Sequence, residues 1–160
     1  MNSLARDSSS AQQLRCTGGF VLPCSAEQAF PFFSPEGERS WAPGWAPRPV
    51  YPDQILFRND TVFLLGTGAQ ESIWTIVNVD WKDYCAEYIR VAPASHIAHI
   101  FVSVAPKGNA RSQVSVSYVV TAFGENASAQ LEPFSETAYA DRMRNWQSQI
   151  VGCLESEAAQ

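Results

Sequence analysis

The apolar and polar positions of the chain divide it into an extended first part and a helical last part. In the first part, short apolar runs rich in β-branched and aromatic residues are separated by turn residues, which is typical of strands. Brief turn-rich connections at 81–83 and 106–109 join neighbouring runs, which predicts antiparallel hairpins in series. The runs that predict strands are 14–22, 61–65, 72–80, 84–91, 95–104 and 113–123.

The last of these runs shows which kind of sheet to expect. Val114, Val116, Tyr118 and Val120 alternate with mostly polar residues. Since successive side chains of a strand point to opposite faces, one face of the sheet is predicted to be buried and the other partly wet. In the first run, the pair Gly18-Gly19 marks either a bulge or a place where another element approaches closely.

From Glu132 onward the apolar period becomes helical. Pro133 suits a first helical turn, and apolar residues then recur every three or four positions on one stripe. A helix of roughly 20 residues spans ~30 Å, so it can cover a whole sheet, and we expect a largely apolar cavity between the two. The stripe consists of Tyr139, Met143, Trp146, Ile150, Cys153 and Leu154.

A short helix and a long loop are predicted directly after the first strand. Ser25 and Gln28 have the spacing of a capping box, and Pro31 and Pro35 keep the helix short. In the segment 35–52, recurring prolines oppose both helix and sheet pairing. Its two tryptophans and one tyrosine argue against disorder, and long ordered loops are often functional.

Composition and charge exclude several classes of protein. The chain has 160 residues, of which 46% are hydrophobic and 17% charged, which favours a folded domain with its own core over a disordered chain. We expect a flexible tail at 1–13, one domain at 14–155 and a short tail at 156–160. The net charge of −5 opposes nucleic-acid binding.

Targeting signals and metal motifs are not visible in the sequence. No segment approaches the ~18 apolar residues of a membrane span, and the first residues lack the apolar region of a signal peptide. We therefore expect a cytoplasmic protein with reduced thiols. His96 and His99 would point to opposite faces of a strand, so we predict no metal site, and we expect no cofactor.

The proline-rich loop resembles one found in SRPBCC proteins, the START-like or polyketide cyclase-like superfamily. The resemblance rests on 34–45 (SPEGERSWAPGW) with Pro47 and Tyr51-Pro52, and it continues through 62–63, 74–77 with Asp80, 88–91, 116–118 and Trp146. It covers roughly 14–154. It implies an α+β helix-grip fold: a curved antiparallel sheet wrapped around a long C-terminal helix, with a deep hydrophobic cavity.

The candidate ligand-binding residues are the aromatic and charged side chains expected around such a cavity. The loop aromatics have two interpretations, as the rim or lid of the cavity or as caps that tie the loop to the core. The full set is Trp41, Trp45, Tyr51, Trp74, Tyr88, Arg90, Tyr118, Met143 and Trp146.

Three residues are candidates for acid–base or anchoring roles: Glu38, His99 and Arg90. Glu38 acts as a general base only if burial raises its pKa, and a salt bridge between Arg39 and a nearby glutamate is the simpler interpretation. An inward Arg90 is suited to holding a carboxylate or phosphate. The alternative for Arg90 is an ion pair, with Asp80, Asp83 or Glu87 as partner.

Three functions fit these observations. The first is binding of a small hydrophobic, aromatic or lipid-like molecule. The second is an enzyme of cyclase, dehydratase or hydrolase type that uses the same cavity, and the third is a protein-interaction domain like the START-like co-chaperones. The resemblance does not decide among them, because one fold hosts many functions. The expected partners are a small hydrophobic molecule and, as a homodimer, a second copy of the chain.

Overall fold

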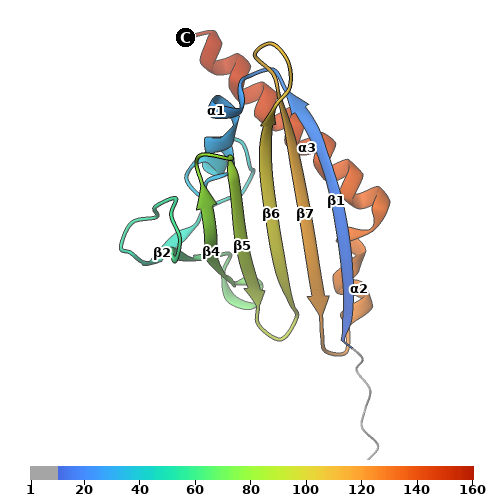
Figure 1. The fold of residues 1–160 in the computed structure, drawn as a ribbon. Coiled ribbons are helices and arrows are strands. Elements are labelled where there is room, and N and C mark those ends of the chain that lie inside the picture. The colour runs from blue at the N-terminus through green and yellow to red at the C-terminus, as the bar shows by residue number, and fades with distance from the viewer. Residues whose placement is uncertain (1–10) are drawn as a thin grey trace, which may run out of the picture.

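A computed structural model describes residues 11–160, in which a seven-stranded antiparallel sheet curves around a long helix (Figure 1). The order across the sheet is β1-β7-β6-β5-β4-β3-β2, so consecutive strands are neighbours except where β1 closes onto β7. The strands are β1 (Gln12–Leu22), β2 (Arg48–Tyr51), β3 (Val62–Leu65), β4 (Ser72–Asp80), β5 (Cys85–Ala92), β6 (His96–Pro106) and β7 (Ser112–Ala122).

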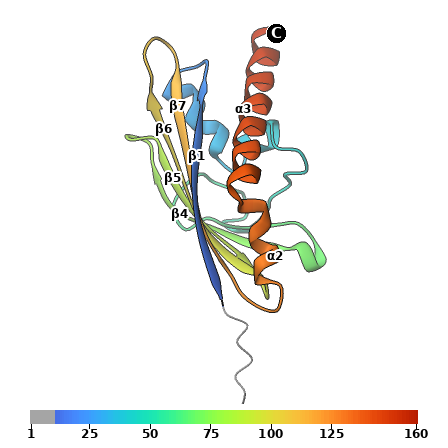
Figure 2. The ribbon, with the colours of Figure 1, turned by 90° about the vertical axis from the view of Figure 1, so that its right-hand side faces the viewer.

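The helical elements lie after β1, within the loops and at the end of the described chain. The last helix, α3, stands against one face of the sheet, and α2 precedes it at one end of the molecule (Figure 2). This arrangement confirms the expected α+β architecture. The elements are α1 (Ala26–Ala29), η1 (Phe30–Phe33), η2 (Gly37–Ser40), η3 (Gly68–Gln70), α2 (Ala127–Leu131), η4 (Glu132–Phe134) and α3 (Glu136–Ala158), where η denotes a 3₁₀-helix.

The predicted capping box starts α1. The Ser25 hydroxyl accepts a hydrogen bond from the Gln28 backbone N–H, and the Gln28 side chain accepts one from the Ser25 backbone. The chain then tightens into η1, whose Phe30 and Phe33 are fully buried. The short helix thus carries aromatic residues into the core directly before the proline-rich loop.

Several boundaries differ from the expected ones. Strand β1 begins at Gln12, inside the expected tail, and residues 1–10 of that tail lie outside the described residues. Helix α3 begins at Glu136 rather than at Glu132, because the Ser135 hydroxyl accepts from the Ala138 N–H and caps it there. At its other end α3 continues to Ala158, through most of the expected C-terminal tail.

The proline-rich loop contains two elements that the sequence did not predict, η2 and the strand β2. All four residues of β2 are exposed, and β2 forms one edge of the sheet. An edge strand tolerates Pro49 because it pairs on one side only. The prolines therefore limit this segment to an edge without excluding it from the sheet.

The alternation predicted for β7 is confirmed, and it identifies the inward face of the sheet. Val114, Val116 and Val120 are buried, and the intervening residues are partly exposed. Hydrogen-bonded pairing places Tyr118 beside Ile100 of β6. The inward face thus continues from strand to strand and presents one concave surface to α3.

Gly18 lies where α3 packs closely against β1. A Cβ added at Gly18 would lie 2.9 Å from Met143 Cγ and 3.0 Å from Tyr139 Cε1, and the β1–β7 register is continuous. Close approach rather than a bulge therefore explains this glycine. The Tyr139 hydroxyl fastens the helix there by donating to the Val116 carbonyl at 2.6 Å.

No helix within residues 11–160 has both the length and the hydrophobicity needed to cross a membrane.

Candidate functional site

A cavity of about 400 Å³ lies between the concave face of the sheet, the proline-rich loop and the segment from α2 to α3. Its floor is built by inward residues of neighbouring strands, among them Trp74 of β4, Tyr88 and Arg90 of β5, Ile100 of β6 and Tyr118 of β7. Trp74 of β4 is paired with Arg90 of β5. The Arg90 Cζ lies 5.4 Å from the centroid of the Trp74 ring, which is a cation–π contact. Residues separated by an even number of positions in these strands thus line one surface.

The loop supplies one wall through Trp41 and Trp45. The indole N–H of Trp41 donates to the Phe32 carbonyl, and that of Trp45 donates to the Pro35 carbonyl, each at 2.8 Å. These tryptophans therefore line the cavity and also tie the loop to the residues that precede it. A wall fixed by two indole hydrogen bonds is preorganised.

The C-terminal segments supply the opposite wall. Trp146 of α3 packs edge-on against Trp41, with ring centroids 5.4 Å apart. Phe134 and Arg142 also line the cavity beside Trp146, although the sequence pattern did not indicate them as candidate ligand-binding residues. Arg142 stands four positions before Trp146, and this spacing places two residues on one helix face.

Arg90 and His96 are polar residues that line the cavity, and Ser95 contacts His96 from the neighbouring depression. Arg90 Nη2 lies 3.0 Å from His96 Nε2, and His96 Nδ1 lies 2.9 Å from Ser95 Oγ. A guanidinium only donates hydrogen bonds, so Nε2 accepts and Nδ1 carries the proton of an uncharged ring. Burial, and secondly the charge of Arg90, lowers the pKa of His96, which favours the same state.

Arg90 does not form the ion pair that the sequence allowed. Asp80 instead accepts hydrogen bonds from the backbone N–H groups of Lys82 and Asp83 in the β4–β5 turn, and Glu87 pairs with His99 on the outer face. Because Glu87 faces outward, the alternation along β5 directs Arg90 inward. Arg90, His96 and Gln130 also line a polar depression of about 320 Å³ beside the cavity.

Glu38, in η2, is the acidic residue that lines the cavity. Burial raises the pKa of its carboxyl well above the ordinary value, and this carboxyl forms no ion pair or hydrogen bond with residues 11–160. The expected loop salt bridge exists, but it joins Arg39 Nε to Glu36 at 2.9 Å. Glu38 thus borders the cavity without a partner among the described residues.

Three candidate residues do not line this cavity. Tyr51 is 67% exposed, because β2 lies at the sheet edge. Met143 points toward Gly18 of β1. His99 has odd parity relative to the inward His96 and therefore faces outward, where it meets Glu87.

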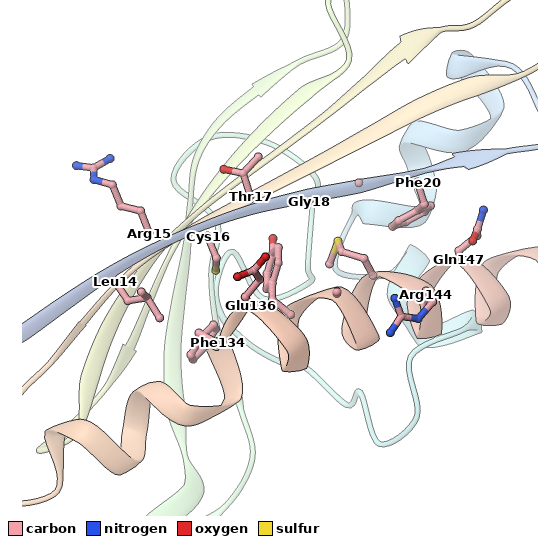
Figure 3. Close-up of a pocket in the computed structure, with 14 residues that line it drawn as sticks. Leu14, Arg15, Cys16, Thr17, Gly18, Phe20, Phe134, Glu136, Arg144 and Gln147 are labelled. Atoms are coloured by element: carbon pink, nitrogen blue, oxygen red, sulfur yellow. The ribbon is translucent and has the colours of Figure 1, made fainter.

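Met143 lines a separate groove of about 620 Å³ between β1 and α3 (Figure 3). In Figure 3, Leu14, Cys16 and Phe20 point from β1 toward the helix, whereas Arg15 and Thr17 point to the other side of the strand. The groove is larger than the cavity, but its lining is more polar. Phe134 borders both spaces and separates them.

Large apolar side chains are also exposed on the outer face of the sheet. Four of them are each exposed by roughly two fifths: Ile73 and Val77 of β4, and Ile97 and Phe101 of β6. The paired Glu87 and His99 lie among them.

Comparison with known proteins establishes the class of fold. No protein-family model and no curated protein matches the chain in sequence. Norcoclaurine synthase from Thalictrum flavum is similar in structure, with a TM-score of 0.63 and 12% identity over 94% of each chain. A structure of that synthase in complex with dopamine and hydroxybenzaldehyde is equally similar, at 13% identity over 94% of this chain and 93% of the other.

A bacterial structure gives the same result. A protein of Thermobifida fusca, solved in solution by NMR, has a TM-score of 0.64 and 15% identity over 89% of this chain and 95% of its own. At such identities the likeness concerns the fold alone. The chain therefore has the helix-grip fold that the sequence resemblance implied.

Proposed function

We propose that the protein binds a small hydrophobic molecule, aromatic or lipid-like, in the cavity between the sheet and α3. The observation that carries the proposal is the cavity itself, with a volume of about 400 Å³ and tryptophan on three of its sides: Trp74 from the sheet, Trp41 and Trp45 from the loop, and Trp146 from α3. Sites for small ligands have volumes of about 300–1,000 Å³ and largely apolar linings. Indole rings offer broad stacking surfaces with little loss of side-chain entropy.

Two further features support this proposal. The tryptophan walls are held by buried contacts before any ligand arrives, so little ordering free energy is lost on binding. A protein of the same fold, norcoclaurine synthase, has been solved with dopamine and hydroxybenzaldehyde, which are small aromatic molecules.

The test is a fluorescence titration with N-phenyl-1-naphthylamine, an uncharged aromatic probe that becomes bright in apolar surroundings. A matched pair of variants identifies where the probe binds. Ala42→Phe places a ring in the cavity, and Ala140→Phe places the same ring in the groove between β1 and α3. Circular dichroism checks the folding of each variant, and Leu65→Trp is a second cavity-filling change.

We expect the wild type to bind the probe, Ala42→Phe to weaken binding at least about tenfold by excluding it, and Ala140→Phe to leave binding unchanged. No binding by the wild type would overturn the proposal. So would weakening by Ala140→Phe alone, because the probe would then occupy the groove.

Glu38 favours an enzyme as the second candidate function. A carboxyl whose pKa is raised by burial, and which faces a cavity without a partner among residues 11–160, is suited to proton transfer. An enzyme of this kind would convert the molecule that the cavity binds. The hypothesis fails if Glu38→Gln leaves turnover of that molecule unchanged.

A further inference from the structure

Two arginines meet at one end of the cavity without an acidic partner. Arg90 extends from β5 and Arg142 from α3, and both line the cavity. The four ion pairs found among residues 11–160 include neither of them. Arg142 is half-buried, whereas burial lowers the pKa of Arg90; because a buried charge without a partner is costly, Arg90 requires a further explanation.

The protein satisfies only part of the hydrogen-bonding capacity of these arginines. Each guanidinium carries five N–H donors. Arg90 donates to His96, and its buried Nε has no partner. Arg142 donates from Nη2 to the Pro133 carbonyl at 3.0 Å. Among residues 11–160, most of these donors have no hydrogen-bond partner.

Aromatic contacts position both guanidinium groups around one ring. The Cζ atoms of Arg90 and Arg142 lie 5.9 Å and 4.6 Å from the centroid of Phe134. Such cation–π contacts attract a positive charge, but they supply no hydrogen-bond acceptor. Burial, together with repulsion from Arg142, lowers the pKa of Arg90, although an arginine stays protonated under ordinary conditions.

The other titratable groups of the cavity do not neutralise this pair. His96 accepts a hydrogen bond from Arg90 and is uncharged. Glu38 forms no ion pair within the described part of the chain. Burial raises the pKa of Glu38, of Tyr88 and of Tyr118, which favours the uncharged form of each. The Arg90–Arg142 end thus lacks a negative charge.

We propose that the ligand of this cavity is a hydrophobic acid, whose carboxylate or sulfonate group is held by Arg90 and Arg142. The aromatic or aliphatic body of this ligand lies toward Trp41 and Trp146. The polar depression beside Arg90 places the charged group near water, and the rest of the molecule occupies the apolar part. This proposal rests on the proposed binding function and adds the charge of the ligand.

The test compares two probes that differ by one charged group. The probe 8-anilino-1-naphthalenesulfonate has the ring system of N-phenyl-1-naphthylamine and an added sulfonate. Both are titrated into the wild type, Arg90→Gln and Arg142→Gln. Arg144→Gln is the matched control, because Arg144 lies on the same helix, is exposed, and pairs with Asp141.

We expect the wild type to bind the sulfonate probe more tightly than the uncharged one. Hydrogen bonds to a charged group predict that Arg90→Gln or Arg142→Gln weakens sulfonate binding about ten- to a hundredfold. Binding of the uncharged probe changes less than about threefold, which also shows that the cavity is intact. Arg90→Lys keeps the charge without the planar fork and recovers part of the affinity.

The outcomes separate this proposal from the binding function. If the uncharged probe binds and the sulfonate probe binds no more tightly, the cavity is a binding site, but the proposal that its ligand is an acid is wrong. If the Arg90 and Arg142 variants weaken both probes equally, or if Arg144→Gln weakens the sulfonate probe as much, the two arginines do not select the anion. If the uncharged probe does not bind, the proposed function itself is overturned.

Discussion

Replacing Trp41 with phenylalanine isolates the contribution of one hydrogen bond to the proline-rich loop. Phenylalanine keeps an aromatic ring in the wall but removes the indole N–H that donates to the Phe32 carbonyl at 2.8 Å. Leaving a buried acceptor without its donor destabilises a protein by about 1–3 kcal/mol. Trp41 is only 5% exposed, so the smaller ring also leaves a void that costs about 1 kcal/mol. We expect a total loss of about 2–4 kcal/mol.

The measurement is urea unfolding followed by far-ultraviolet circular dichroism. With a slope of about 2 kcal/mol per molar urea, the expected loss lowers the midpoint by about 1–2 M. Trp81→Phe is the control, since Trp81 is 51% exposed and its indole donates no hydrogen bond to residues 11–160. We expect this control to lose less than about 1 kcal/mol. Equal shifts in the two variants would refute the reasoning, because the hydrogen bond would then contribute nothing.

Two further predictions concern charge and close packing. Burial raises the folded-state pKa of Glu38. The wild type therefore loses stability relative to Glu38→Gln as the pH rises above about 4.3, the pKa of glutamate in the unfolded chain. Urea midpoints of the two proteins that differ by a constant amount between pH 4 and 8 would contradict this. Gly18→Val forces side-chain atoms against Met143 and lowers stability by about 1–3 kcal/mol. Gly152→Val, where a Cβ meets no atom within 4 Å, leaves the thermal midpoint nearly unchanged, and equal effects at the two glycines would show that packing against α3 is not the cause.

The strands and the long helix were predictable because burial on one face imposes a period on the sequence. The valines of β7 and the stripe of α3 follow from this rule. Strand β2 was not predictable, since all four of its residues are exposed and it contains Pro49. Its place at the edge depends on pairing with β3, which is a long-range contact that local sequence does not encode.

Part of the cavity was predictable for the same reason, and part was not. Parity along a strand puts His96 and His99 on opposite faces, but the sequence alone does not say which one faces inward. Arg142 was missed because charged residues on a helix usually face solvent. Its side chain turns toward the cavity only because Phe134 and the end of the sheet lie beside that turn of α3.

Two faces of α3 explain where the core ends and the cavity begins. Tyr139, Met143 and Ile150 are buried and belong to the hydrophobic core, so the space between helix and sheet is filled along this face. Arg142 and Trp146 line the cavity instead, and their polar atoms require partners that an apolar core does not offer. The helix therefore completes the core along one face and borders the cavity along the other. Arg142 joins these two roles, because it anchors the start of α3 to the Pro133 carbonyl and presents a positive charge to the cavity.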